Sequence, residues 1–581
     1  MKRRIALLIA AILIASVSIG AYAEHGGGPG GPGGSGGPGG GSGMRESDVA
    51  GTGNSVNTSG KISVNSNQVT ADADLTAYVT VSGETVAVKG LNYASADYSD
   101  TLISAADSYV EITDADIALT VTDPISGTEQ GGTTLYTDSG TTVIADSMIS
   151  VDGAGRYTVA ATGTATMIVR DSVIRAGGDN GAGGNTSSVS EPASNAGLLI
   201  SGTSRANFSV GQTHTFYYDS LCVADGWAAL STDSATGSGL EFVAADTEAV
   251  ALHGGYGIYS DTNCRDYLYG CTLVSAEIGG IISNNGSIVV DSSDSALDAV
   301  TQDGYGALLY AEDGYTADSG RSEFIAGRNC FQIHSPDMMG EGASDYTASL
   351  SLSHTDLITD DTMNQDGYSF TSSVDGETYL VQADTDYAGK YSAAVGAYVD
   401  YVRGTAILVK STSADIVLND VTVTSSNGVA LLTALNSDSM SRYLKKDVVN
   451  GVSVSVENSI IDGDFVHDDY QRDMRITLTA STLNGAVNYA TADEWNARWA
   501  EYATDENACW INLDSSVYVT STHETILSLT EGSVWNVTGA SRLTRLSVSA
   551  DSTINGVISA EQTETQADGT IVYTNVTVIC E

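Results

Sequence analysis

Proline is scarce in this sequence of 581 residues. Of the six prolines, three lie between residues 29 and 38, so only Pro124, Pro192 and Pro336 remain for everything that follows. Proline removes a hydrogen-bond donor from a β-ladder and is tolerated mainly at sheet edges. Its scarcity argues against a secreted domain rich in loops and favours a fold in which almost every strand is central.

Basic residues are also few, because 24 Lys and Arg stand against 72 Asp and Glu, a formal net charge of -48. Such a field repels nucleic acids and anionic membranes and favours cations or cationic partners. We therefore expect no nucleic-acid partner. Since the acidic residues are scattered along the chain, solubility is a simpler explanation of the charge.

Cysteine and histidine show no pattern typical of a metal site, because CxxC is absent and the seven His lack ligand spacing. In an exported chain the six Cys can form disulfides. Cys264 and Cys271 flank one short segment, and we expect them to pair. The sequence 362–367 partly resembles an EF-type calcium loop but lacks its usual first and last ligands. We assign no metal and no cofactor, and leave a structural calcium at an acidic turn open.

The N-terminus is typical of a secretory signal. Basic residues 2–4 precede an apolar run, Ile5–Gly20, and Ala21-Tyr22-Ala23 fits the cleavage rule, so residues 1–23 should be removed. An uncleaved anchor is the alternative, although the run is short for a membrane span. Residues 24–48 are rich in Gly, Pro and Ser and are expected to be a flexible linker. We expect a secreted or cell-surface protein with no membrane span after cleavage.

A repeat of about two dozen residues runs through the remaining sequence. A turn tetrad such as Asp219–Cys222 recurs with spacings of 27, 24, 24 and 27, and its second residues are Ser220, Thr247, Cys271, Ser295 and Ser322. A second series lies out of phase with the first, in short apolar runs that usually follow Gly: Leu230, Ile258, Ile281, Leu308 and Ile333. Two interleaved series with one loose period indicate a repeated structural unit.

Each unit contains short runs of Val, Ile, Leu, Ser and Thr, broken by Gly, Asp and Asn, which is typical of strands. A unit of this length has room for about three strands but cannot bury its apolar face alone. Stacking the units solves this problem and pairs each strand with its equivalents. The sequence therefore predicts an all-β parallel β-helix of roughly twenty coils over residues 49–581.

Three insertions interrupt the predicted β-helix, near residues 177–197, 360–404 and 484–509. The first two are expected to be protruding loops or hairpins. The third should contain one short helix, because Thr491 and Glu494 have the spacing of a capping box.

Aromatic residues at helical spacing follow this capping box, namely Trp495, Trp499 and Tyr502. Packing of this face onto the β-helix is the simpler interpretation. An exposed platform for sugar rings is the alternative, because Trp and Tyr combine an apolar face with a polar edge.

The end of the chain resembles a known family. Residues 533–546 read S-V-W-N-V-T-G-A-S-R-L-T-R-L, which is similar to the S-x-W-x-V-x-G-x-S-x-L-x-x-L run in the last coils of pertactin-like autotransporter passengers. The resemblance implies a right-handed parallel β-helix, displayed as an adhesin or toxin on Gram-negative cells. The family continues into a membrane barrel, for which this sequence leaves no room, so self-translocation is not expected.

Parallel β-helices include pectin lyases and polygalacturonases, so their motifs were sought. Of the polygalacturonase motifs N-T-D, D-D, G-H-G and R-I-K, only His253-Gly254-Gly255 bears a faint likeness. Lyases of this shape use a basic residue as proton acceptor beside calcium, and Arg328 with His334 is the only similar grouping. We assign no catalytic residue and favour a protein that is not an enzyme, with a polysaccharide lyase or glycoside hydrolase as the alternative.

Tyrosine is the commonest aromatic residue, at 29 against seven Phe, and several tyrosines lie in the repeats. Stacked coils would align them into a surface for ligands, but tyrosine ladders also stabilise neighbouring strands without binding anything. The candidate ligand-binding residues are Tyr256, Tyr259, Tyr267, Tyr269, Tyr305, Tyr310, Trp495 and Trp499. We expect an adhesin-like protein that binds host or environmental glycans or cell-surface proteins, with a passive structural spacer as a third possibility.

Overall fold

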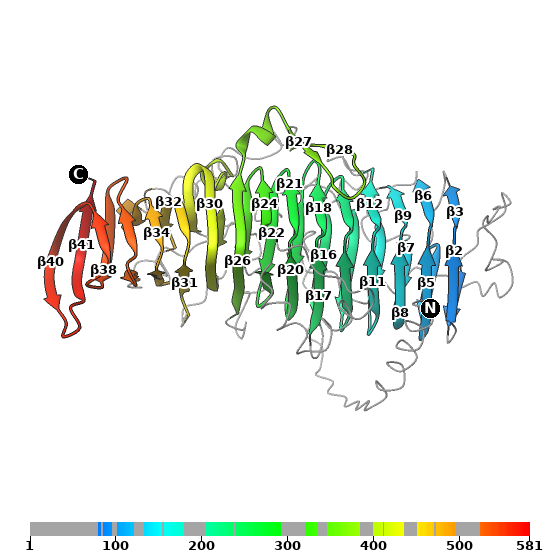
Figure 1. Cartoon of the computed structure of the whole chain (residues 1–581), viewed down its shortest axis with the longest axis horizontal. Coiled ribbons are helices and arrows are strands. Elements are labelled where there is room, and N and C mark those ends of the chain that lie inside the picture. The colour runs from blue at the N-terminus through cyan, green and yellow to red at the C-terminus, as the bar shows by residue number, and fades with distance from the viewer. Residues whose placement is uncertain are drawn as a thin grey trace, which may run out of the picture. The chain divides into compact units, whose positions relative to one another are not determined.

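The computed structural model describes one stack of parallel strands, all within the compact unit formed by Gly39–Ser293 and Asp318–Glu581. Figure 1 shows the strands lying side by side in chain order. The described residues are 79–82, 85–95, 101–120, 133–153, 156–178, 204–235, 239–291, 320–334, 346–383, 399–410, 412–434, 450–469, 472–491, 493–494, 497 and 523–580. The all-β parallel β-helix predicted from the repeat is confirmed.

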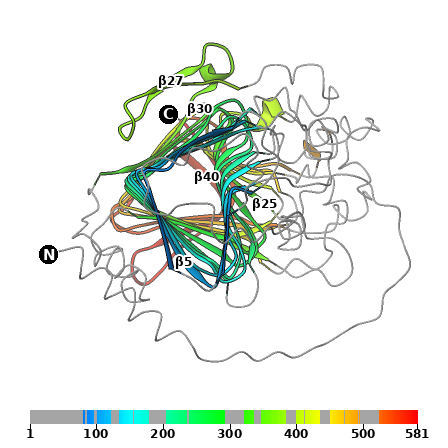
Figure 2. The ribbon, with the colours of Figure 1, turned by 90° about the vertical axis from the view of Figure 1, so that its right-hand side faces the viewer.

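Each coil has three sides, which Figure 2 shows end-on. Within the coils, each strand pairs in parallel with the equivalent strand of the next coil, usually three strands later in the chain. The first side contains β1 (Val79–Ser82), β4 (Ile103–Ala106), β7 (Thr133–Thr137), β10 (Tyr157–Ala161), β13 (Arg205–Gly211), β16 (Ala228–Ala235), β19 (Tyr256–Ser260), β22 (Ile278–Ser283), β25 (Asn329–His334), β29 (Ile407–Lys410), the ends of β30 (Ser413–Ala434) and β32 (Ile460–His467), and β35 (Val487–Tyr489).

The second side contains β2 (Thr85–Lys89), β5 (Ser108–Thr113), β8 (Gly140–Ala145), β11 (Thr166–Arg170), β14 (His214–Tyr218), β17 (Leu240–Ala245), β20 (Cys264–Tyr269), β23 (Ser287–Asp291), the first halves of β26 (Thr347–Thr359) and β30, then β31 (Val452–Glu457), β33 (Met474–Thr479), β36 (Thr525–Thr530) and β38 (Ser541–Val548).

The third side contains β3 (Asn92–Ser95), β6 (Asp116–Thr120), β9 (Met148–Asp152), β12 (Val173–Gly177), β15 (Leu221–Ala224), β18 (Glu248–Ala251), β21 (Thr272–Ser275), β24 (Ser322–Ala326), parts of β26, β30 and β32, then β34 (Thr482–Asn484), β37 (Val534–Asn536) and β39 (Thr553–Asn555). This third side holds fourteen strands or strand segments within the described residues. The roughly twenty coils predicted cover residues 49–581, part of which lies outside the described residues.

The register agrees with most of the predicted repeat. Ser220 and Thr247 lie at equivalent positions of neighbouring coils, as do Leu230 and Ile258. The coil predicted at Ser295 and Leu308 is wrong, because β21 pairs directly with β24, and β22 directly with β25. One whole unit of the sequence period is therefore an insertion and not a level of the stack.

A ladder of buried hydroxyl groups explains the turn tetrad. Each of these Ser or Thr side chains donates to the carbonyl two or three residues earlier, and several accept the N–H of the equivalent residue in a neighbouring coil; the ladder includes Ser147, Ser172, Ser220, Thr247, Ser459, Ser481 and Ser533. The residue before several of them is an aspartate with positive φ, as at Asp171 and Asp246 (47° and 44°). Asp tolerates this left-handed conformation better than most residues.

Removing one hydroxyl from this ladder should be costly, whereas removing an outward one should not. Ser459 accepts from the Val421 N–H at 3.0 Å and donates to the Glu457 carbonyl at 2.6 Å. We expect Ser459→Ala to destabilise the protein by about 1–3 kcal/mol, because buried groups are left without partners. Ser455, four residues away and partly exposed, is the control, and Ser455→Ala should change stability by less than about 0.5 kcal/mol. Equal losses in urea unfolding would refute the role of the ladder.

One carboxyl group lies inside the coil. Asp266 on β20 is fully buried, and the Thr232 hydroxyl donates to its two oxygens at 3.0 Å. Burial raises the pKa of Asp266 well above its ordinary value, and the hydrogen bonds lower the pKa only in part. Because the pKa of Asp266 is higher in the folded state than in the unfolded state, the free energy of unfolding falls as the pH rises above the unfolded-state pKa of about 3.9.

We expect Asp266→Asn to raise the melting temperature at pH 7, because the amide keeps a hydrogen-bond acceptor without the buried charge. The gain should shrink towards zero below pH ~4, where the carboxyl group is protonated in both states. Melting curves of both proteins from pH 3.5 to 7.5 provide the measurement. A gain that does not depend on pH would contradict the assignment.

A strap formed by residues 360–383 covers the outside of the third side, where the sequence predicted a protruding loop or hairpin. It contains the short helix η1 (Asp361–Asn364) and the antiparallel pair β27 (Tyr368–Thr371) and β28 (Thr378–Val381), drawn above the stack in Figure 1. Its Met363, Val381 and Ala383 pack against outward apolar residues of four coils: Leu221, Val223, Val250, Leu252, Val274, Ala276 and Ile325. Ser373 also donates from its backbone N–H and its hydroxyl to Glu248, at 2.9 and 2.6 Å.

The C-terminal end of the stack is closed by an antiparallel hairpin, β40 (Val557–Thr565) and β41 (Ile571–Ile579). β41 pairs with β38 along both the first and second sides. Near this end the predicted capping box is confirmed, since the Thr491 N–H donates to Glu494 at 2.9 Å and the Glu494 N–H to the Thr491 hydroxyl at 3.3 Å. Asp493, Glu494 and Ala497 are helical.

A candidate binding face and its charged corner

The predicted tyrosines do not form one exposed strip. Tyr256 and Tyr259 are neighbours on β19, with ring centroids 5.4 Å apart, but only 1% and 6% of them is exposed. Tyr267 and Tyr269 lie on the second side, where Tyr269 is buried and Tyr267 is partly exposed. The other predicted residues, Tyr305, Tyr310, Trp495 and Trp499, lie outside the described residues.

Tyr256 instead belongs to a buried cluster around a guanidinium group. Arg205 lies 5.5 Å from the ring of Tyr157 and 5.8 Å from that of Trp227, and forms an ion pair with Asp233 at 3.2 Å. Burial raises the pKa of Tyr256 to about 12, which keeps it neutral. This arrangement is typical of cation–π stabilisation between coils, and its aromatic faces are already occupied by protein.

The predicted disulfide between Cys264 and Cys271 is wrong, because both thiols are free and buried. Cys264 begins β20 and Cys271 follows its end, so roughly 20 Å of extended chain separates them. Their sulfur atoms contact backbone carbonyls of Thr232 and Ala244. Burial raises the pKa of Cys271 to about 12, so it behaves as a small apolar residue.

Arg328 and His334 do not converge on a common site. Arg328 is buried and forms an ion pair with Glu277, Nε to Oε2 at 3.4 Å. His334 is at the far end of β25, where it shares a hydrogen bond of 3.2 Å with Ser283, and burial, with the charge of Lys410, lowers its pKa to about 3. The two residues are six positions apart along an extended strand, about 20 Å. This grouping therefore lacks the geometry of the lyase site considered above.

No group of three His, Cys, Asp or Glu within the described part of the chain is arranged to hold a metal ion. The stacked turn aspartates come nearest to an acidic site. Burial, together with the charges of Asp246 and Asp171, raises the pKa of Asp219 to about 6. This repulsion between neighbouring coils is a property of the stack and gives no evidence of a ligand.

A regular polar surface covers the second side over its last six strands, β26, β30, β31, β33, β36 and β38. We call it the hydroxyl face, defined by the outward residues Ser349, Ser351, Ser353, Asp415, Val417, Asn419, Ser453, Ser455, Glu457, Arg475, Thr477, Thr479, Ile526, Ser528, Thr530, Arg545 and Ser547. Burial alternates along most of these strands, with Leu350 and Leu352 of β26 fully buried between outward serines. On β14 and β17 of the same side, by contrast, most outward residues are buried.

Most hydroxyl groups in the middle of this face are not used by the protein itself. Ser351, Thr477, Ser528 and Ser547 form no side-chain hydrogen bond with any other described residue, and Ser455 forms only a long one, 3.5 Å, to Glu457. The inward hydroxyl ladder is engaged, as shown for Ser459. A rigid sheet thus presents donors and acceptors that are aligned and available.

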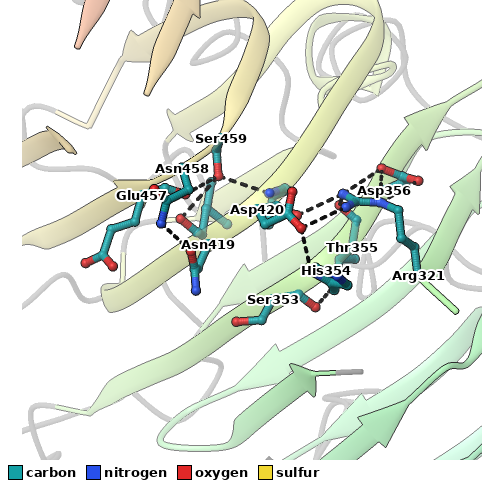
Figure 3. Close-up of polar contacts among 12 residues, drawn as sticks. Arg321, Ser353, His354, Thr355, Asp356, Asn419, Asp420, Glu457, Asn458 and Ser459 are labelled. Atoms are coloured by element: carbon teal, nitrogen blue, oxygen red, sulfur yellow. Dashed lines mark hydrogen bonds and ion pairs between the residues drawn. The ribbon is translucent and has the colours of Figure 1, made fainter. Parts of the chain in front are cut away.

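A charged corner borders the hydroxyl face where the second side turns into the third (Figure 3). Arg321 binds both oxygens of Asp356 at 3.1 Å and also Asp420, Nη1 to Oδ2 at 3.1 Å. His354 contacts Asp420 through Nδ1. His354 and Asp420 both have positive φ, 54° and 52°, so the corner continues the turn ladder with paired charges in place of repeated aspartates.

The corner is partly exposed, with 46% of the His354 side chain and 44% of the Asp420 side chain accessible. A carboxylate at Nδ1 orients a histidine ring, as in many general bases. Arg321 is fully committed to carboxylates and to the carbonyls of Thr355 and Asp420, and a guanidinium group cannot accept a proton. His354 is therefore the basic residue of this corner that can exchange a proton.

Sequence reasoning missed both features. The hydroxyl face has a clear signal, because S-L-S-L-S at 349–353 and T-L-T at 477–479 alternate with a period of two. The corner has none, since Arg321 and Asp420 are 99 positions apart.

No protein-family model matches this chain, and no curated protein matches it either. Among the described residues, no helix is long and apolar enough to span a membrane.

Proposed function

We propose that this chain is an exported extracellular binding protein, adhesin-like, which holds glycans on the hydroxyl face. The unengaged hydroxyl groups of Ser351, Thr477 and Ser528 carry the proposal, because glycans are recognised through many hydrogen bonds to hydroxyl groups. The resemblance of residues 533–546 to right-handed, pertactin-like passengers supports display outside the cell. Cell-surface proteins are the other class of partner compatible with such a face.

Binding to an array of soluble and immobilised glycans tests this function. The purified chain should bind at least one class of glycan, and Thr477→Lys should weaken binding, because a long charged side chain would obstruct the face. A chain that bound neither glycans nor cell surfaces would instead be a passive spacer, and the proposal would fall.

The alternative is a polysaccharide lyase or glycoside hydrolase, and the His354–Asp420 pair at the edge of the hydroxyl face favours it. In that case incubation with polysaccharides should release unsaturated or reducing ends, and His354→Ala should abolish the release. Binding without any product would exclude this alternative for the substrates used.

A further inference from the structure

The hydroxyl face is a two-dimensional grid. Its middle row contains Ser351, Val417, Ser455, Thr477, Ser528 and Ser547, which are in register on six neighbouring strands. Neighbouring strands are ~4.8 Å apart, and outward residues of one strand are roughly 6.7 Å apart. Only Val417, which is 39% exposed, interrupts the row of hydroxyl groups.

The side chains of this row suit a long, flat ligand more than a short one. None of the outward residues of the hydroxyl face is aromatic, so no ring is available to stack on a single sugar. Single hydroxyl hydrogen bonds contribute little because water competes for them. Affinity must come from many such contacts made together, which only a long or ordered ligand can provide.

Rigidity of the face increases the value of each contact. The inward residues behind the middle row, such as Leu352, Leu418 and Leu478, are buried in the continuous core. The outward hydroxyl groups are therefore held in position before any ligand arrives, which reduces the entropy lost on binding.

Charge decides between neutral and acidic polysaccharides. The face carries Asp415 and Glu457 near its edges, balanced in number by Arg475 and Arg545, but the whole chain has a formal charge of -48. A polyuronate would be repelled by this field. The middle row itself is uncharged.

From this grid we propose that the hydroxyl face binds an uncharged, extended polysaccharide in its ordered, insoluble form, of the cellulose or chitin class. Laid across the strands, an extended chain of this class presents hydroxyl or acetamido groups along its whole length, so several of them can meet hydroxyl groups on neighbouring strands, ~4.8 Å apart. This inference rests on the proposed glycan-binding function and specifies its ligand.

Co-sedimentation tests the ligand class directly. The full chain is mixed with microcrystalline cellulose, crystalline chitin, soluble cello- and chito-oligosaccharides, or polygalacturonate. We expect the chain to bind one of the crystalline solids and at least tenfold less of the soluble oligosaccharides or polygalacturonate. Stronger binding to soluble oligosaccharides or to polygalacturonate would overturn the inference but leave the proposed function standing. Failure to bind any glycan would refute both the inference and the proposed function.

A triple variant locates the site on the face. Ser455→Lys, Thr477→Lys and Ser528→Lys together should reduce binding to the crystalline solid by at least tenfold, while the melting temperature changes little because all three side chains point outward. The control is Thr422→Lys, Ile460→Lys and Thr482→Lys, three outward residues in register on the third side.

Equal binding by both triple variants would overturn the inference. So would a wild-type chain that self-associates in sedimentation velocity and becomes monomeric in the hydroxyl-face variant, because the face would then bind a second copy of the chain.

Discussion

Replacing Glu277 by alanine is expected to destabilise the β-helix by about 3–5 kcal/mol, because it removes one partner of a buried ion pair. Glu277 lies at the turn before β22 and is buried together with Arg328, whose Nε is 3.4 Å from its carboxylate. Arg403 approaches the same oxygen at 3.8 Å. Without the carboxylate, the two guanidinium groups would lie close together with no negative charge between them.

Chemical unfolding in guanidinium chloride measures this loss, and an exposed ion pair provides the control. Arg475 and Asp473 form a contact of 2.7 Å on the surface. Asp473→Ala should cost less than about 1 kcal/mol, because solvent screens exposed pairs. If Glu277→Ala cost no more than Asp473→Ala, the pair could not be important for stability.

Replacing Trp535 by alanine is expected to cost about 3–5 kcal/mol. The Trp535 side chain is fully buried inside the last parallel coils, stacked between Leu483 and Ile554, and its indole N–H donates to the Gly485 carbonyl at 2.8 Å. The change would leave a large cavity and an unpaired carbonyl next to the C-terminal hairpin.

Two further variants separate the contributions at this site. Trp535→Phe should lose less, because the phenyl ring fills much of the space and only the hydrogen bond, about 1 kcal/mol, disappears. Val534→Ala, at the outward neighbour, should change stability by under about 0.5 kcal/mol. A Trp535→Ala protein as stable as the Val534→Ala protein would show that the tryptophan does not hold this end together.

The fold was predictable because its determinant is local and repeated. The polar residue of the turn tetrad recurs in many coils for one reason, the inward hydroxyl ladder, so Ser220 and Thr247 could be aligned from spacing alone. The spacing of the repeat cannot identify an insertion that has the same length as a coil. In the sequence, residues 292–319 lie between β21 and β24, which pair directly with each other. The positions of Ser295 and Leu308 nevertheless fit the repeat as well as those of residues in a real coil.

The candidate site was less predictable because its residues depend on burial and on long-range contact. Tyr256 and Tyr259 have the composition of a sugar platform, but their environment makes them part of a closed cluster. Arg321 meets Asp420 only because β24 and β30, which are distant in sequence, both pair with β26. The outward serines of β26 could have been recognised from alternation, yet alternation does not show which outward residues remain unengaged.

The strap affects how the β-helix unfolds. In a solenoid each level contacts only its neighbours, so levels can be lost singly from either end. The strap joins four of them, from Leu221 to Ile325, by contacts that include Ser373 with a carboxylate 125 positions earlier. These four coils should therefore unfold cooperatively. Local unfolding that begins at either terminus should stop when it reaches them.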